Sequence, residues 1–105
     1  FTLQAGTYLV EWSAPAYQVA RHSTRLQNIT DSTTDSEGTS EYNAGTGNIQ
    51  TTSTGAGIIT IAGAKVFEIQ HYADTTSANN GLGISSNVSG QNSVFTLVKI
   101  HKIGA

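Results

Sequence analysis

The chain has 105 residues, of which 11% are charged, and a formal net charge of −2 at pH 7. This length predicts a single domain spanning residues 1–105. Five lysine and arginine residues spread along the chain cannot form the concentrated basic surface of a nucleic-acid-binding protein, and no apolar run is long enough to cross a bilayer. The absence of cysteine excludes disulfides and thiolate metal sites, which leaves oligomerisation as a means of reinforcing a small core.

The first strong pattern lies in residues 6–13, where Tyr8, Val10 and Trp12 share one face of a predicted strand. A period of two with aromatic and β-branched residues is typical of a half-buried strand. Because proline has no backbone N–H for a sheet ladder, Pro15 is expected to end this strand.

The middle of the chain predicts strands of varied length separated by polar turns. A long strand over residues 17–30, with room for a bulge, places Arg21 and Arg25 on one face. Residues 31–38 are expected to be a polar connection. Further strands are expected at 39–43, 48–53, 57–61 and 65–73, followed by a loop over 74–83.

The last predicted strand covers residues 93–103 and is apolar on both faces. Phe95 and Leu97 point to one face, and Val94, Val98 and Ile100 point to the other. In a small sandwich only one face of each sheet meets the core, so something else must cover the second face. An interface in a homo-oligomer is the favoured cover, and an overlying loop is the alternative.

No helix is predicted, and the short strands with Gly, Ser and Asn turns indicate an all-β antiparallel sandwich or jelly roll. The histidines His22, His71 and His101 all fall in predicted strands. Three histidines could ligate zinc, but no short ligand pair is present, so hydrogen-bonded strand residues are the favoured interpretation. A cluster around an oligomer axis would make assembly sensitive to mild acid. The acidic segment 31–37 lacks the EF-hand pattern and predicts a solvated turn instead of a calcium site.

No arrangement in the sequence predicts catalysis, a cofactor or a metal. The nucleophile elbow of hydrolases is absent, and nothing indicates that Glu11 and Glu68, the two acids in firm strands, converge. The row of Arg21 and Arg25 could bind an anion or a sugar, or it could pair with these acids across an interface. Pairing across an interface is the favoured interpretation. For ligand binding, Tyr42, Tyr72 and the loops 31–38, 43–47 and 74–90 suit carbohydrate faces and hydroxyls.

Five segments together resemble the C-terminal domains of bacteriophage tail-fibre and related virion proteins, which are similar to the trimeric C1q and tumour-necrosis-factor jelly rolls. The segments are LQAGTYLVEWSAPAY (3–17), RHSTRLQN (21–28), GTSEY (38–42), KVFEIQHY (65–72) and SVFTLVKIHKI (93–103). These motifs are patterns of strand residues and define no active site. The group usually carries further strand-forming sequence before the segment that matches residues 1–3.

The resemblance implies a C1q/TNF-like jelly roll that forms a compact homotrimer, as the C-terminal part of a longer fibre protein on the virion surface or otherwise outside the cell. It implies a non-enzymatic structural and receptor-binding module whose partners are its own copies and a cell-surface glycan or protein. The alternatives are a purely architectural capsid-decoration or fibre subunit and a carbohydrate-binding module of a larger protein. We predict that the trimer interface contains Arg21, Arg25, Glu68, Tyr72, Val94, Val98 and Ile100.

Overall fold

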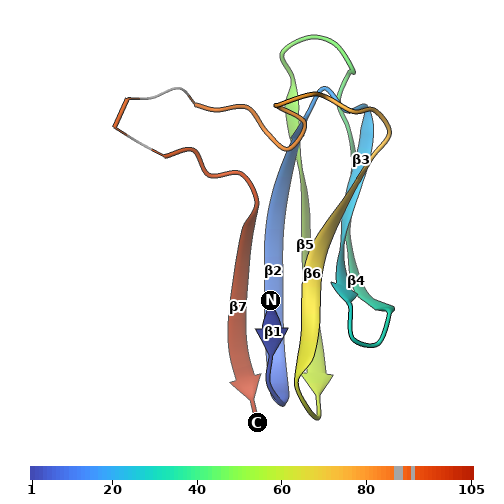
Figure 1. The fold of residues 1–105 in the computed structure, drawn as a ribbon, viewed down its shortest axis with the longest axis vertical. Coiled ribbons are helices and arrows are strands. Elements are labelled where there is room, and N and C mark those ends of the chain that lie inside the picture. Colours follow the sequence, from blue (N-terminus) through green and yellow to red (C-terminus); the bar gives the residue numbers. More distant parts are fainter. Residues whose placement is uncertain (87–88, 91) are drawn as a thin grey trace.

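The computed structural model describes residues 1–86, 89–90 and 92–105, which form two antiparallel sheets without any helix among them. The larger sheet has the strand order β1-β6-β3-β4, and the smaller sheet has the order β5-β2-β7 (Figure 1). The strands are β1 (Thr2–Leu3), β2 (Gly6–Tyr17), β3 (Arg21–Asn28), β4 (Thr33–Tyr42), β5 (Gln50–Ile61), β6 (Lys65–Ala73) and β7 (Leu97–Gly104). The predicted all-β antiparallel sandwich is confirmed, while the jelly-roll topology stays a prediction.

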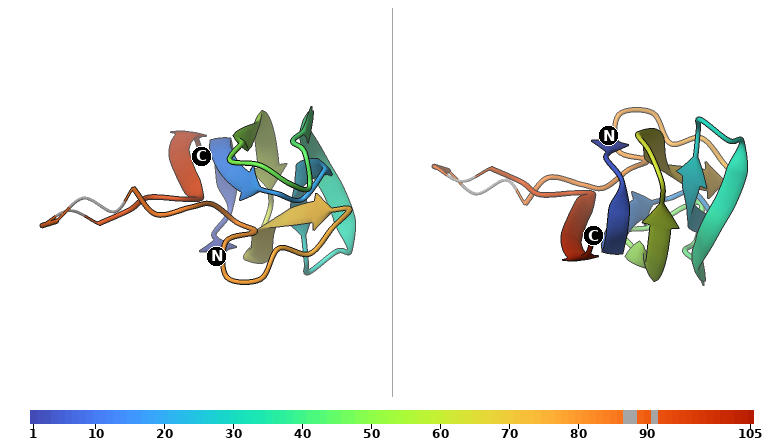
Figure 2. Two further views of the ribbon diagram at one scale, coloured as in Figure 1. Left: turned by 90° about the horizontal axis from the view of Figure 1, so that it is seen from above. Right: turned by 90° about the horizontal axis from the view of Figure 1, so that it is seen from below.

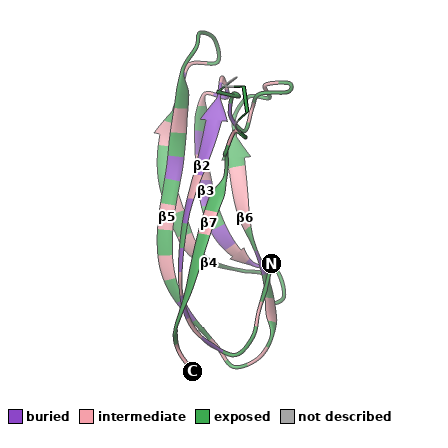
Figure 3. Cartoon of the chain, turned by 90° about the vertical axis from the view of Figure 1, so that its left-hand side faces the viewer, coloured by how far each residue is buried: buried purple, intermediate pink, exposed green. Residues whose placement is uncertain are grey.

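The core lies between the sheets and is centred on β2, which is the most buried strand in Figure 3. Its alternating residues Tyr8, Val10 and Trp12 are buried, as their period of two predicts. They pack against Leu26 of β3, Ile59 of β5 and Phe67 of β6. Burying a large apolar side chain contributes about 1.5–3 kcal/mol, so this cluster holds the two sheets together.

Strand β2 does not end before Pro15, contrary to the prediction from sequence. It continues to Tyr17, and Pro15 pairs with Thr52 of β5. The other neighbour, β7, accompanies β2 only as far as Ser13. Beyond Ser13 the strand has a sheet partner on one side alone, and proline is tolerated at such an edge because one side needs no ladder bond.

A turn before Arg21 corrects the predicted long strand, because β3 begins only at that residue. Gln18 and Ala20 adopt left-handed backbone conformations with φ of 57° and 64°. The buried Asn43 side chain fixes the turn, since its Oδ1 accepts hydrogen bonds from Val19 N at 2.7 Å and Ala20 N at 3.2 Å. The sequence does not predict this turn, because neither glutamine nor alanine commonly adopts the left-handed conformation.

Two further predicted boundaries are wrong because strands continue through them. Most of the expected connection 31–38 belongs to β4, which pairs with β3 through two register shifts, so the expected bulge lies in this pair. Strand β5 is continuous over both of the shorter strands expected there. Gly55 lies inside β5 because a Cβ there would overlap the indole of Trp12. Strand β6 has the predicted bounds.

The last strand is shorter than predicted, because β7 starts at Leu97. Val94 therefore lies in the β6–β7 connection (residues 74–96) and not on the strand. Within β7 the predicted facing is correct: Leu97 pairs beside Ser13 on one face, and Val98 and Ile100 lie on the other.

The molecule is a thin slab of 46 × 33 × 18 Å with a Cα radius of gyration of 15.2 Å. A compact domain of about 100 residues has a radius near 13 Å. The radius of gyration exceeds this value because part of the β6–β7 connection extends away from the two sheets (Figures 1 and 2). No helix able to span a membrane occurs in the described ranges.

Candidate functional site

Strand β7 exposes apolar side chains at one edge of the smaller sheet, with β2 as its strand neighbour. Leu97, Ile100 and Ile103 are exposed, while Val98 packs partly against the core. Figure 3 shows the strand as largely exposed. The larger sheet ends in β1, a strand of two residues, which is too short to cover the inner face of β7. We call the exposed side chains of Val94, Leu97, Ile100 and Ile103 the β7 edge.

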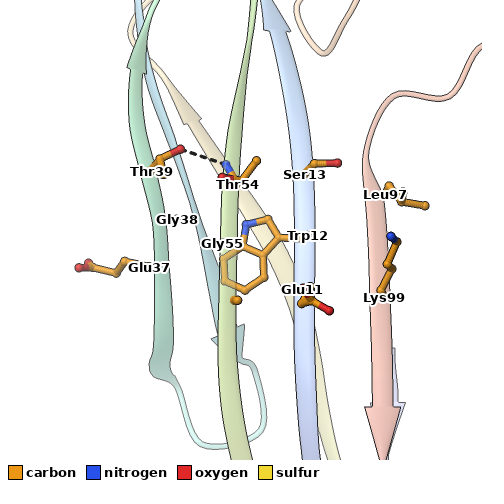
Figure 4. A pocket seen from close by; sticks show the side chains of 11 residues that line it. Glu11, Trp12, Ser13, Glu37, Gly38, Thr39, Thr54, Gly55, Leu97 and Lys99 are labelled. Carbon is orange, nitrogen blue, oxygen red and sulfur yellow. Dashed lines mark hydrogen bonds between the residues drawn. The ribbon is translucent and has the colours of Figure 1, made fainter.

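A shallow cavity of about 620 Å³ adjoins the β7 edge (Figure 4). Leu97 and Lys99 of β7 line one side of it, and Glu37 of β4 lines the other. Gly55 and Ala56 of β5 contribute small residues to the lining between them. The cavity therefore continues the exposed surface of β7 across the smaller sheet and has room for side chains of a partner.

The predicted interface residues lie on two different surfaces. Val98 and Ile100 belong to β7, and Val94, which is 73% exposed, precedes that strand. Arg21, Arg25, Glu68 and Tyr72 share the outer face of β3 and β6 in the larger sheet. The apolar residues of the predicted interface thus lie together at β7, and its polar residues lie together on the larger sheet, but the two groups are on separate surfaces.

The outer face of β6, β3 and β4 carries two adjoining hollows, which we call the tyrosine trough. One hollow of about 480 Å³ has Arg21, Tyr42 and Asp74 in its lining. The other, of about 540 Å³, has Arg25, Glu37 and Gln70 in its lining. Ser23, Ser40 and Tyr72 line both hollows, which makes the trough continuous along the sheet.

Two tyrosines stand on the strands that flank β3. Tyr42 of β4 pairs with Arg21, and Tyr72 of β6 pairs with Ser23. Their exposed fractions of 65% and 64% leave both rings open to a ligand. Ser23 separates Tyr72 from Ser40 across the sheet, and Arg21 lies beside Tyr42. The Arg21 Nη1 atom lies 3.8 Å from Asp74 Oδ2, which places both charges at this end of the trough.

Hydrogen bonds fix the polar groups of the trough in place. Tyr72 Oη donates to Asp74 Oδ1 at 2.9 Å, and this bond raises the pKa of Tyr72. Arg25 Nε donates to Gln70 Oε1 at 2.7 Å, and Gln70 Nε2 donates to Glu68 Oε1 at 2.7 Å. A ligand would therefore meet side chains that are already oriented.

Two of the three histidines form a hydrogen-bonded pair between the sheets. His22, which is 2% exposed, has its Nδ1 atom 2.9 Å from His71 Nε2 and its Nε2 atom 2.7 Å from Thr51 Oγ1 of β5. Burial lowers the pKa of both imidazoles, and the charge of Glu41 partly opposes this at His22. His71 Nδ1 is buried without a hydrogen-bond partner among the described residues. Both rings are therefore expected to be neutral at pH 7.

The other candidate ligands and acids do not join this pair. His101 lies on β7, with its Nε2 atom 3.9 Å from Glu11 Oε1. Glu68 belongs to the outer face of the other sheet, so the two strand acids Glu11 and Glu68 do not converge. In the acidic segment 31–37, for which a solvated turn is predicted, Asp31 Oδ1 accepts a 3.0 Å bond from Lys65 Nζ. The described residues contain no group of three or more His, Cys, Asp or Glu placed to hold a metal ion.

The loops predicted to bind ligands have different outcomes. Residues 33–38 form strand, and residues 43–47 lie in the connection between β4 and β5. In the predicted loop 74–90, residues 87 and 88 lie outside the described ranges. Residues 74 and 81 anchor this connection, since Asp74 N donates to Arg21 O at 2.9 Å and Tyr17 N donates to Gly81 O at 3.1 Å.

Comparisons with models of protein families, with curated proteins and with solved structures found no match.

The sequence indicates the two tyrosines and the two arginines of the trough and places Asp74 in the predicted binding loop 74–90, but it does not single out Ser40. The signal for Ser40 is its alternation with Tyr42, which places both on one face of a strand. The predicted strand 39–43 contains both residues, but a serine carries no signal of its own in a chain so rich in Ser and Thr. Asp74 follows β6 directly, and its role depends on the end of that strand lying beside Arg21.

Proposed function

We propose that this chain is a non-enzymatic structural and receptor-binding module that associates with its own copies through the β7 edge to form a homotrimer. In this proposal it is part of a phage tail fibre or a similar virion fibre, outside the cell, and mediates attachment to a host surface. The observation that carries the proposal is a terminal strand that exposes Leu97 on one face and Ile100 on the other.

Contact with another copy would remove these side chains from water. Each fully exposed Leu, Ile or Val gains about 1.5–3 kcal/mol on complete burial, and these residues are partly exposed, so the gain per residue is smaller. Association costs about 4–15 kcal/mol in lost rigid-body freedom, so an interface must extend beyond the strand. Val94 and the cavity beside Leu97 supply adjoining surface for that extension.

The lysines of β7 favour a closed assembly over open-ended pairing of edge strands between copies. Lys99 and Lys102 lie within the edge strand, and charged residues in edge strands oppose uncontrolled strand pairing. Closed symmetry is the usual form of a homo-oligomer. The number of subunits and the fibre role rest on the resemblance of the strand motifs to virion fibre domains.

Sedimentation of single-residue variants tests the assembly. Leu97→Asp and Ile103→Asp place a charge on the β7 edge and should convert the trimer to monomer, because an unpaired carboxylate resists burial. Ile58→Asp is the matched control, since Ile58 is an exposed isoleucine on β5, the opposite edge of the same sheet. A wild-type protein that sediments as a stable monomer contradicts the proposal, as does equal dissociation by the control variant.

The architectural alternative, a subunit without a receptor, predicts a different result with host cells. The folded wild-type trimer should bind intact cells of a susceptible host if the attachment role is correct. A trimer that binds no such cells would favour the architectural role.

A further inference from the structure

The tyrosine trough has the shape and the surface chemistry of a carbohydrate site. Two exposed aromatic rings, Tyr42 and Tyr72, line a hollow whose lining also contains Ser23, Ser40 and Arg21. The C–H face of a pyranose ring packs on an aromatic ring, while its equatorial hydroxyls point sideways to polar groups. Here the polar groups stand beside the rings, with Asp74 in one hollow and Gln70 in the other.

The length of the trough indicates an oligosaccharide and not a single sugar. The two hollows have volumes of about 480 and 540 Å³ and share Tyr72 in their lining. Tyr72 therefore lies between two subsites, and Tyr42 lies at one end. A chain of sugar rings running along β3 would meet a ring or a hydrogen-bonding group in each hollow.

The charges of the trough favour a neutral ligand. Arg21 lies beside Asp74, and Arg25 is linked to Glu68 through Gln70. Each cation thus has an acid close to it, and the trough presents no net positive surface for a phosphate or a polyanion. The carboxylate and amide oxygens instead accept hydrogen bonds from sugar hydroxyls, and the guanidinium groups donate to them.

We propose that the tyrosine trough binds a neutral oligosaccharide, with sugar rings stacked on Tyr42 and Tyr72 and hydroxyls bonded to Asp74, Gln70 and Arg25. The inference rests on the proposed attachment role and names the chemical class of its receptor. It assigns the polar face of the larger sheet to the ligand and leaves the β7 edge for contacts between subunits.

The test uses an immobilised array of short neutral hexose oligosaccharides and titration of the best-bound one. Wild-type protein should bind, and Tyr42→Ala and Tyr72→Ala should each weaken binding about tenfold or more, the loss expected for one stacking contact. Tyr72→Phe keeps the ring and loses only the bond to Asp74, so its loss should be smaller. Ser40→Tyr fills both hollows without removing a ring and should also weaken binding. Ile58→Ala, on the other sheet, should leave it unchanged.

Sedimentation of the same variants separates this inference from the assembly proposal. A blank array with folded wild-type protein overturns the inference, as do Tyr42→Ala and Tyr72→Ala variants that bind as well as wild type. If these two variants dissociate the trimer, the face is a subunit contact and the inference is wrong. A monomeric wild type whose sugar binding depends on both tyrosines supports the inference while contradicting the assembly.

Discussion

At the scale of single residues, the buried pair of His22 and His71 is the group most sensitive to pH. One of the two facing nitrogens carries the shared hydrogen and the other accepts it, which requires at least one neutral ring. Full protonation would place two N–H groups and two positive charges against each other inside the core. Thr51, which belongs to the smaller sheet, forms a hydrogen bond with the His22 ring. A change at the histidine pair therefore affects both sheets.

The pair predicts acid destabilisation of the fold. Burial lowers both folded-state pKa values below the ordinary value of 6.5, so the unfolded chain binds more protons as the pH falls through that value. The free energy of unfolding should reach its full value above pH 6.5. It should fall as the pH drops from 6.5 toward the folded-state pKa values of the two histidines. Thermal unfolding followed by circular dichroism between pH 8 and pH 5 measures this.

Two variants control the pH experiment. His22→Asn combined with His71→Gln should flatten the dependence of the melting temperature on pH in this window, even where it lowers stability at pH 7. His101→Gln is the control, because that imidazole lies on β7 and is not part of the pair. A steep dependence that survives the double substitution would assign the effect to other groups.

At the scale of the elements, the strands of strict alternation were predictable and the boundaries set by tertiary contacts were not. Strand β6 is predicted with its observed bounds, because Phe67, Ile69 and His71 recur with a period of two inside it. Strand β5 is predicted in two pieces, 48–53 and 57–61, with Gly55 in the gap and Gly57 at the start of the second piece. What they accommodate, the Trp12 indole and the Ser36 side chain, comes from other strands and is invisible in the local sequence.

The candidate site shows the same division. The shared face of Arg21 and Arg25 follows from alternation along one strand, and so does the facing of Val98 and Ile100. That these two sets lie on separate sheets follows from strand order, which depends on long-range pairing that no local pattern encodes. Asn43 was likewise missed, because its bonds to the turn at residues 18–20 depend on the chain returning to that point.

The packing of Trp12 against Gly55 predicts a large effect of a small substitution. Gly55→Val should destabilise the protein by about 1–3 kcal/mol, because its side chain would force the buried indole from its position. Gly63→Ala is the control, since a Cβ at Gly63 meets no atom within 4 Å, and it should be neutral or slightly stabilising. Urea unfolding of the three proteins measures both changes, and equal midpoints would contradict the close packing.

At the scale of the whole molecule, a slab only 18 Å thick must obtain stability from a shallow core. The buried cluster is a single layer between two sheets, and polar side chains interrupt it. Trp12 Nε1 donates to Thr24 Oγ1 at 2.7 Å, which lies 2.8 Å from Ser53 Oγ. These bonds satisfy buried polar atoms, but they contribute less than the apolar burial that they replace.

Association should therefore raise the stability of the fold. If the folded chain forms a trimer and the unfolded chain does not, the melting temperature must rise with protein concentration. Differential scanning calorimetry over a hundredfold range of concentration should show this rise for the wild type and for Ile58→Asp. Leu97→Asp should melt at one temperature throughout. A wild-type melting temperature that does not vary would show that subunit contacts contribute nothing to folding.

The close fit of Trp12 beneath Gly55 also gives the protein an internal optical reporter. The chain has one tryptophan, it is 4% exposed, and it lies on β2 in the core, away from the outer face that carries Tyr42 and Tyr72. Its fluorescence emission should shift to longer wavelength when the sheets separate and water reaches the ring. A sugar stacked on Tyr42 and Tyr72 would change the intensity of tyrosine emission and leave the tryptophan band in place. Excitation at two wavelengths would then distinguish loss of the fold from occupation of the surface in one sample.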